Sequence, residues 1–359
     1  MNTFTWIEAK TPEQVVAELQ SARGGPVAVK AGGVDLLDRL KEGLEAPERL
    51  INVRRLSARG MTEIAERKKE ALPEGVAKLL PSDTAGAEPP PRDCLVLGAN
   101  ATLAQLAGHP LINQHLPALA AAAGGAATPQ IRQVATLGGN LMQRPRCWYF
   151  RSVEHPCLKK GGTVCFAQDG ENDFHAIFDN RGCSAVHPSA AAVALVALEA
   201  IVALLGPTGE RFARLSALLV SPNQPGGDVK RENRIDPGEL ITAVYVPTPR
   251  AGERNLYLKV KQKQSFDWPL CDVAIAVRTG AGKPVEAARV VLGAVAPIPW
   301  RAKAAEAALM QLSRVDAASV RQVGQAAVQG ATPLGKNSYK VPLCAGLVAR
   351  AAFELLGGK

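Results

Sequence analysis

The chain has 359 residues, of which 47% are hydrophobic and 21% charged, a composition typical of soluble globular proteins and not of disordered or fibrous ones. This length accommodates two or three domains of roughly 100–200 residues each. Lys and Arg outnumber Asp and Glu by 42 to 33, but the basic residues are scattered and only 4% of residues are aromatic, so a nucleic-acid-binding surface is not indicated.

Residues 11–23 predict a helix that Thr11 caps and that carries Pro12 in its first turn. A strand over residues 26–30, a second helix over 35–44 and a strand over 50–53 complete an α/β unit. Residues 61–93 are charged and then rich in proline, which predicts an extended surface insertion outside the core.

Residues 94–98 predict a strand, residues 99–108 the start of a helix, and residues 116–127 an alanine-rich helix that stops at Thr128-Pro129. Residues 130–142 form a polar segment that becomes rich in glycine. The most apolar stretch, residues 190–206, contains Glu199 and falls short of the about 20 residues of a membrane-spanning helix. It predicts a buried helix, capped by Ser189, and the first strand of a hairpin over residues 200–215, so no membrane span is expected.

Residues 221–236 are rich in glycine and proline and predict a linker between two domains. Beyond it, strands are expected over residues 239–247, 256–263, 272–278 and 288–294. Helices are expected over residues 301–312, 316–328 and 341–356. Strands and helices in separate blocks are typical of α+β domains.

Two segments contain paired glycines, residues 29–36 with Gly32 and Gly33, and residues 136–140 with Gly138 and Gly139. Glycine permits positive φ and lets backbone N–H groups surround an anion, which a helix N-terminus also favours. Neither the G-x-G-x-x-G nor the P-loop pattern is present. A phosphate-bearing cofactor and plain tight turns therefore remain open as interpretations.

Four of the seven cysteines follow the second glycine segment: Cys147, Cys157, Cys165 and Cys183. Basic residues flank them, and thiolates are soft ligands that suit an iron–sulfur cluster or zinc. The wide spacings lack the C-x2-C pairs of structural zinc sites. A cluster or metal, disulfides and unpaired thiols all remain compatible with the spacing.

Several segments occur in an order that resembles a known family. They are Ala31-Gly-Gly-Val-Asp35, Gly98-Ala-Asn-Ala-Thr102, Gln130 to Asn140, His187-Pro-Ser189 and Leu292-Gly-Ala-Val-Ala-Pro297. Together they resemble the FAD-binding medium subunit of the xanthine dehydrogenase and molybdenum hydroxylase family, with residues 61–93 unmatched. The resemblance implies an α+β fold. A two-part α/β FAD-binding domain of the vanillyl-alcohol-oxidase (PCMH) type would span residues 1–225, and a C-terminal domain of the CO dehydrogenase flavoprotein type, a sheet with three helices, residues 236–359.

The resemblance also implies which residues bind FAD. The pyrophosphate would lie against Val29, Lys30, Ala31, Gly32, Gly33, Val34, Asp35 and Leu36. The rest of the cofactor would lie against Thr102, Thr136, Gly138, Gly139 and Asn140, with Ile241 and Lys259 at the flavin ring. Two positions depart from the family pattern, since Val34 stands where Ser or Thr is frequent and Ala190 where Asp is common.

The cysteine segment is similar to that of medium subunits from bacterial periplasmic aldehyde oxidoreductases that carry a 4Fe-4S cluster. The similarity rests on residues 144–150 and 183–189 and implies a cluster on Cys147, Cys157, Cys165 and Cys183, in a loop at about residues 144–186. His155 and His175 would be hydrogen-bonding neighbours or alternative ligands. The other cysteines, Cys94, Cys271 and Cys344, are expected in the core.

The resemblance implies an electron-transfer subunit, with no catalytic residue of its own, in a heterotrimeric oxidoreductase acting on an aldehyde. Its partners would be a large molybdopterin subunit, a small subunit with two 2Fe-2S clusters and an external electron acceptor. A free-standing FAD oxidase and a zinc-stabilised interaction module are the alternatives. Residues 1–10 carry no recognisable signal, so we expect the cytoplasm, or the periplasm if a signal-bearing partner is exported with this chain.

Overall fold

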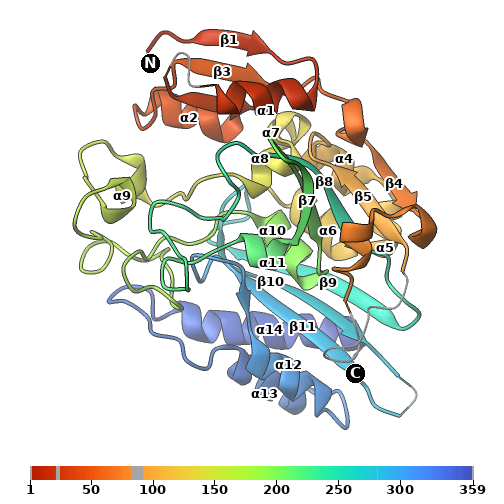
Figure 1. Ribbon diagram of the computed structural model, residues 1–359. Coiled ribbons are helices and arrows are strands. Elements are labelled where there is room, and N and C mark those ends of the chain that lie inside the picture. Colours follow the sequence, from red (N-terminus) through yellow and green to blue (C-terminus); the bar gives the residue numbers. More distant parts are fainter. Residues whose placement is uncertain (1, 22–24, 82–91, 281, 358–359) are drawn as a thin grey trace.

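The computed structural model describes residues 2–21, 25–81, 92–280 and 282–357 (Figure 1). Three sheets organise them: a three-stranded sheet of order β1-β3-β2, a five-stranded sheet of order β4-β5-β8-β6-β7 and a four-stranded sheet of order β12-β11-β10-β9. Within the described residues, no helix is both long and apolar enough to cross a membrane.

The N-terminal layer is the predicted α/β unit with one further strand, β1, that the sequence analysis did not predict. Its parallel strands are β1 (Thr5–Glu8), β3 (Arg49–Asn52) and β2 (Val27–Lys30), with helices α1 (Pro12–Gln20) and α2 (Val34–Lys41). Thr11 caps α1 by accepting a hydrogen bond from the Gln14 N–H, and Pro12 occupies the first turn, as the sequence predicts.

The five-stranded sheet is antiparallel and forms the centre of the molecule. It contains β4 (Ile64–Arg67), β5 (Cys94–Gly98), β8 (Leu240–Pro247), β6 (Ile201–Gly206) and β7 (Gly209–Arg214). Around it lie α4 (Leu103–Gly108), α5 (Pro110–His115), α6 (Pro117–Gly124), α7 (Pro129–Val134), α8 (Leu137–Leu141), α10 (Ala190–Ala197) and α11 (Leu215–Leu218). Ser189 caps the buried helix α10, as expected.

The C-terminal part contains three of the four strands and all three helices expected there, while the strand expected over residues 239–247 belongs to the central sheet as β8. Its antiparallel sheet contains β9 (Glu253–Lys261), β10 (Pro269–Arg278), β11 (Ala287–Gly293) and the short β12 (Trp300–Arg301). Helices α12 (Lys303–Met310), α13 (Ala317–Ala327) and α14 (Lys340–Leu356) cover one face, while α6 and α10 pack on the other (Figure 1). The sheet is therefore buried on both faces.

Three expectations need correction. The segment after residue 61 is not wholly a surface insertion, because β4 pairs with β5 and the short helix α3 (Glu74–Ala77) is followed by a buried Leu80. Val76 in this helix and Leu80 just after it pack in one cluster with Cys94 and Ile201. The proline-rich residues 82–91 lie outside the described residues.

Thr128-Pro129 does not only end a helix but also begins the next one. The Thr128 hydroxyl accepts a hydrogen bond from the Ile131 N–H and so caps α7, with Pro129 in its first turn. The polar, glycine-containing segment after it is therefore helical, as α7 and α8.

The linker over residues 221–236 is irregular but does not separate the two sheets. The next strand, β8, pairs with β5 and β6 of the central sheet, and the C-terminal sheet begins with β9 at Glu253. The change of sheet therefore falls between Pro247 and Glu253, and not at residues 225–236.

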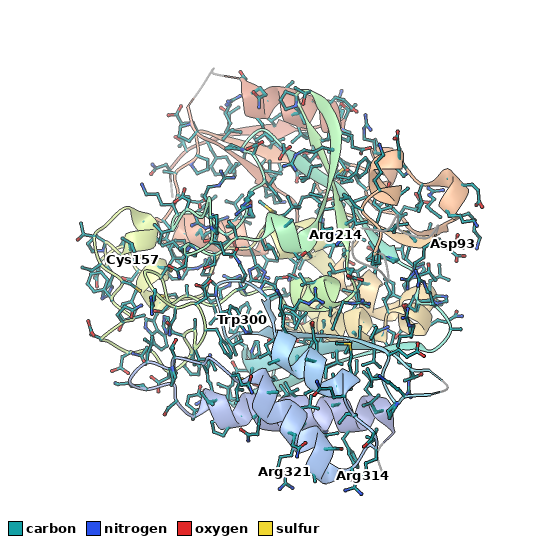
Figure 2. The ribbon with its side chains drawn as sticks, turned by 60° about the horizontal axis from the view of Figure 1, so that its bottom comes forward. Asp93, Cys157, Arg214, Trp300, Arg314 and Arg321 are labelled. Atoms are coloured by element: carbon teal, nitrogen blue, oxygen red, sulfur yellow. The ribbon has the colours of Figure 1, made fainter. Side chains whose placement is uncertain are left out.

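Residues 142–188 form a lobe of mostly irregular chain beside the N-terminal layer (Figure 1). It contains α9 (Trp148–Arg151) and a 3-10 turn at Leu158–Lys160. Two further 3-10 turns, Ala58–Gly60 and Lys69–Ala71, lie elsewhere. Figure 2 shows Cys157 within the lobe, away from the helical layer that carries Arg314 and Arg321.

Candidate functional site

A long cleft runs along the N-terminal layer. It consists of two cavities of about 440 and about 660 Å³ that share lining residues. The shared residues are Val29, Ala31, Leu36, Arg39, Thr136, Gly139 and Met142. Because both paired-glycine segments line it, the two motifs found in the sequence meet in one place.

The first glycine segment links β2 to α2. Gly33 adopts a left-handed conformation with φ of 81°, and no side chain caps the helix that follows. The first N–H groups of a helix have no partner within it, so the N-terminus of α2 presents unpaired donors where it borders the cleft. Any Cβ at Gly32 would overlap the backbone carbonyl of Val134, so glycine is required for this loop to pack against the end of α7.

The second glycine segment is arranged differently. Its N–H groups are already used inside the protein, since Leu137 donates to Ala101 O, Gly138 to Ala99 O and Gly139 to the Thr136 hydroxyl. A Cβ at Gly138 would lie 3.2 Å from Ala99. These glycines therefore allow close packing against residue 99. At the cleft, α8 presents side chains, because the N–H groups of its first turn are already hydrogen-bonded.

All but two of the fifteen residues expected at FAD line the cleft. The exceptions are Lys30, whose ammonium lies 5.3 Å from the centre of the Trp6 ring, and Thr102, which caps α4 in a capping box with Gln105. Both therefore have local structural roles. Val34 and Ala190, the two departures from the family pattern, do line the cleft.

Asp35 faces a group of arginines. Its carboxylate lies 3.1 Å from Arg39 Nε, 3.0 Å from Arg146 Nη2 and 2.6 Å from Arg151 Nη2, and it accepts a hydrogen bond from the Arg144 N–H. Burial opposes ionisation, but these arginines outweigh it and lower the pKa of Asp35. This carboxylate joins α2 to the lobe and keeps three cations at the cleft.

Strands β8 and β9 also contribute to the cleft, Ile241 to the cavity of about 440 Å³ and Lys259 to that of about 660 Å³. Ile241 on β8 is buried, and Lys259 on β9 donates from Nζ to Gly125 O at 3.0 Å. Burial lowers the pKa of Lys259. Phe266 and Trp268, in the loop after β9, are exposed and border the same cavity, with Arg146 5.1 Å from the Trp268 ring centre.

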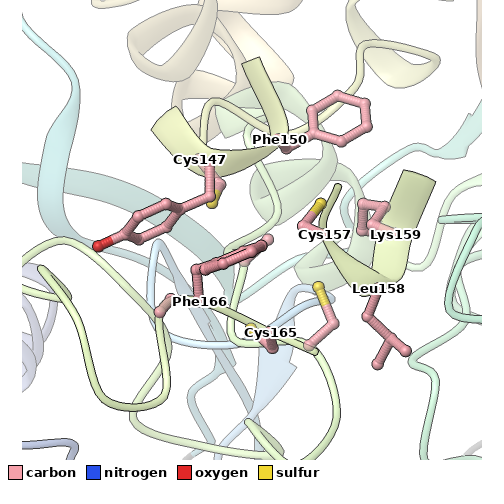
Figure 3. A pocket seen from close by; sticks show the side chains of 11 residues that line it. Cys147, Phe150, Cys157, Leu158, Lys159, Cys165 and Phe166 are labelled. Carbon is pink, nitrogen blue, oxygen red and sulfur yellow. The ribbon is translucent and has the colours of Figure 1, made fainter. Parts of the chain in front are cut away.

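The four cysteines of the lobe line a single pocket. Figure 3 shows Cys147, Cys157 and Cys165 turned toward the same space, with Phe150 and Phe166 at its edge, and Cys183 completes the lining. The structure therefore brings together the four cysteines that the sequence singled out. The other three, Cys94, Cys271 and Cys344, are buried in the core as expected.

Burial in this pocket disfavours the thiolate form of the cysteines, and a few neighbouring groups act in the opposite direction. Burial raises the pKa of the Cys147 thiol to about 12, against hydrogen bonds from the Phe150 and Tyr149 N–H groups. Burial likewise raises the pKa of Cys183, and the buried ammonium of Lys159 opposes it. His175 Nε2 lies 3.1 Å from Cys147 Sγ, the hydrogen-bonding position expected for this histidine, while His155 Nδ1 contacts Ser152 Oγ at 3.1 Å.

The cysteine pocket and the cleft are adjacent. Arg144 lines the cleft, and its guanidinium lies 4.8 Å from the ring centre of Phe150, which lines the cysteine pocket. Glu232 pairs with Arg144 at 3.0 Å and with Lys159 at 2.7 Å, which connects the two sites through charges. Arg144 and Lys159 are recognisable in the sequence only as neighbours of the cysteines, and no pattern there indicates Glu232, Phe266 or Trp268.

Comparison with known proteins now identifies the family. A family model described as FAD binding domain in molybdopterin dehydrogenase matches residues 91–249, and one described as CO dehydrogenase flavoprotein C-terminal domain matches residues 256–355. The aldehyde oxidoreductase FAD-binding subunit PaoB of Escherichia coli (strain K12) is 32% identical over 99% of this chain and 98% of its own length. The chain belongs to the FAD-binding subunits of the molybdenum hydroxylases.

The chain is also similar to carbon monoxide dehydrogenases. The carbon monoxide dehydrogenase medium chain of Hydrogenophaga pseudoflava is 24% identical over 97% of this chain and 95% of that protein. A solved carbon monoxide dehydrogenase from the same organism superposes with a TM-score of 0.69, covering 98% of this chain and 96% of that one at 24% identity. The α+β fold and the oxidoreductase family expected from the sequence are thereby confirmed. The two matched regions meet between residues 249 and 256, where the sheets change.

Proposed function

We propose that this molybdenum hydroxylase subunit carries FAD in the cleft and a 4Fe-4S cluster on Cys147, Cys157, Cys165 and Cys183. It would transfer electrons within a heterotrimer that oxidises an aldehyde. The partners would be a large molybdopterin subunit and a small subunit with two 2Fe-2S clusters, and an external acceptor would take the electrons. The adjacent cleft and four-cysteine pocket carry this proposal, and the likeness to the PaoB subunit supports the substrate class.

The residues of the cleft fit FAD. The uncapped N-terminus of α2 and the close-packed glycine loop at Gly32 and Gly33 suit a pyrophosphate. Asp35 holds Arg146 and Arg151 at the same cleft, where their guanidinium groups offer further N–H donors to phosphate oxygens. Thr136 and Asn140 offer polar side chains further along the cleft, and Asn140 Oδ1 is fixed by a 2.6 Å hydrogen bond from Ser189 Oγ. When bound, FAD supplies two-electron chemistry, and Lys259 would lie at its ring as a cation that favours the reduced form.

The residues of the cysteine pocket fit an iron–sulfur cluster. Four thiols line one enclosed space, backbone N–H groups point at the sulfur of Cys147, and Lys159 supplies positive charge. Among the described residues, no group of three or more potential ligands converges on a single metal-ion position. A four-iron cluster takes one cysteine thiolate at each iron, so four cysteines lining one pocket match its ligand number. The wide spacings of these cysteines in the sequence lack the C-x2-C pairs of structural zinc sites. When bound, such a cluster supplies one-electron transfer.

The charges between the two sites suit electron transfer. Glu232 is shared by Arg144 at the cleft and Lys159 at the cysteine pocket, and all three are held by hydrogen bonds. Fixed charges of this kind need little rearrangement when an electron moves. We assign no catalytic residue to this chain, because substrate oxidation would belong to the large subunit. The chain would function in the cytoplasm, or in the periplasm if a signal-bearing partner is exported with it.

Replacing Cys157 with Ser tests the proposal. In anaerobically purified protein the variant should lose iron and retain FAD, because Cys157 lines the cysteine pocket and not the cleft. Cys94→Ser is the matched control, since Cys94 is a buried cysteine remote from both sites and should keep iron and flavin. Flavin loss without iron loss in the Cys157 variant would overturn the assignment. Zinc without flavin in the unaltered chain would favour an interaction module, and aldehyde oxidation by the isolated chain would favour a free-standing oxidase.

A further inference from the structure

Two cysteines outside the proposed cofactor sites lie in contact in the C-terminal core. Cys271 on β10 and Cys344 on α14 are both fully buried, and their Sγ atoms are 2.6 Å apart. Non-bonded carbon atoms rest at about 3.5–4.0 Å, and a disulfide bond measures about 2.05 Å. The two sulfurs are therefore closer than ordinary packing requires and need only a small side-chain movement to bond.

The packing of β10 against α14 holds Cys271 and Cys344 next to each other. Alternate residues of β10 face opposite sides of the sheet, and Cys271, Val273 and Ile275 face the helices and share a core with Cys344 and Val348 of α14. Both elements are packed along their length, so the contact does not depend on a loose loop. Cys94, the third core cysteine, lies in a separate cluster beside Ile201.

We propose that Cys271 and Cys344 are a disulfide-forming site that joins β10 to α14. The oxidant would be a small-molecule or protein disulfide. One thiolate attacks a sulfur of that disulfide and releases a thiol, and the second thiolate then displaces the other half, so that the protein loses two protons and two electrons and the oxidant becomes two thiols. Any compartment that supplies such oxidants during folding would produce the link.

The surroundings indicate when the bond forms. Burial and the neighbouring thiol raise the pKa of Cys271 well above its usual value, with the Lys340 ammonium acting in the opposite direction. Thiolates are therefore scarce at this position in the folded protein, and no oxidant reaches it. The bond would form as α14 docks on the sheet, when the thiols are still accessible, and would afterwards be shielded from reductants.

The disulfide would also stabilise the contacts between α14 and the cysteine lobe. Lys340 lies one helical turn before Cys344, and its Nζ donates to Phe174 O at 2.9 Å and to His175 O at 3.0 Å. Because His175 contacts Cys147, the start of α14 buttresses the segment beside the four-cysteine pocket. A bond between α14 and β10 would therefore keep the Lys340 contacts with this segment in place when the end of α14 frays.

Peptide mapping of the full-length chain tests the proposal. The chain is incubated anaerobically with oxidised glutathione at urea concentrations just below its unfolding midpoint, alkylated after full denaturation and digested. We expect a peptide linking residues 271 and 344, and an intact mass lower than that of the reduced chain by two hydrogen atoms until a phosphine reductant restores it. Full alkylation of both cysteines, or links to other cysteines in their place, would overturn the proposal.

Two variants separate this result from other thiol chemistry. Cys344→Ala should abolish the linked peptide and leave Cys271 alkylated, whereas Cys94→Ala should leave the link unchanged. The linked wild-type chain should also have a higher urea midpoint than its reduced form, because the bond closes a loop between positions 73 residues apart. The mapping of the unaltered chain decides the matter even if a variant folds poorly. Iron and flavin contents are measured separately, so failure of this proposal leaves the proposed function untouched.

Discussion

Replacing Asp35 with Asn removes the charge that joins α2 to the cysteine lobe. The guanidinium groups of Arg39, Arg146 and Arg151 now lie 2.6 to 3.1 Å from this carboxylate. In the variant they would lose this shared negative charge. The side chain of Asp35 is only 12% exposed, and that of Arg151 only 9%. We therefore expect both a loss of stability and a looser N-terminus of α2 at the cleft.

The size of this loss follows from burial. Breaking a buried ion pair by removing one partner costs about 3–5 kcal/mol. The lower end applies here, about 3 kcal/mol, because Arg146 is 24% exposed and Arg151 keeps Glu42 at 3.4 Å. Asp38→Asn is the matched control on the same helix. Asp38 is 51% exposed and lies 3.5 and 3.6 Å from the same arginines, so its loss should cost less than about 1 kcal/mol.

Urea denaturation followed by circular dichroism measures both variants. The pKa of Asp35 is lowered in the folded chain, so its stabilisation is fully present above its unfolded pKa of about 3.9 and disappears as the pH falls through the folded value. The gap between wild type and Asp35→Asn should therefore be full at pH 7 and shrink below about pH 4. Equal losses for the two variants at pH 7 would refute the reasoning.

Two further predictions concern backbone packing and buried charge. Gly32→Ala should lower the free energy of unfolding by about 1–3 kcal/mol and weaken FAD retention, because the new Cβ meets the Val134 carbonyl. Gly335→Ala is the control: its Cβ would have open space around it, so neither the urea midpoint nor the flavin content should change. Burial raises the pKa of Asp272 to about 6, so its contribution to stability is present below about pH 4 and lost as the pH rises through 6. Between pH 4 and 6 the free energy of unfolding of the wild type should fall by up to about 1.4 kcal/mol per pH unit because of Asp272, and Asp272→Asn should remove this fall. An unchanged pH dependence in the variant would contradict the assignment.

Local chemistry made much of the fold predictable. Thr11, Ser189 and Asp316 are N-cap residues whose side chains accept hydrogen bonds from the first turns of α1, α10 and α13, as helix capping requires. The charged composition after residue 61 does not reveal that Val76 is buried in a cluster with Cys94 and Ile201, which are distant in the sequence. Such burial depends on tertiary contacts that a local pattern does not contain.

The candidate site was predictable in its parts and not in its arrangement. Glycine chemistry identified the loop at Gly32, and spacing identified the four cysteines. Glycine at position 138 also predicted close backbone approach to a cofactor, but the Gly138 N–H donates its hydrogen bond to Ala99 O inside the protein. The contact between Asp35 and Arg151 joins residues 116 positions apart, so only the folded chain reveals that it links the cleft to the lobe.

The central claim is that one chain carries both a flavin and an iron–sulfur cluster. Iron, acid-labile sulfide and flavin analysis of the anaerobically purified wild-type chain tests it most directly. The account predicts about four iron atoms, about four sulfides and one FAD per chain. FAD without iron, or zinc in place of iron at the four cysteines, would contradict it.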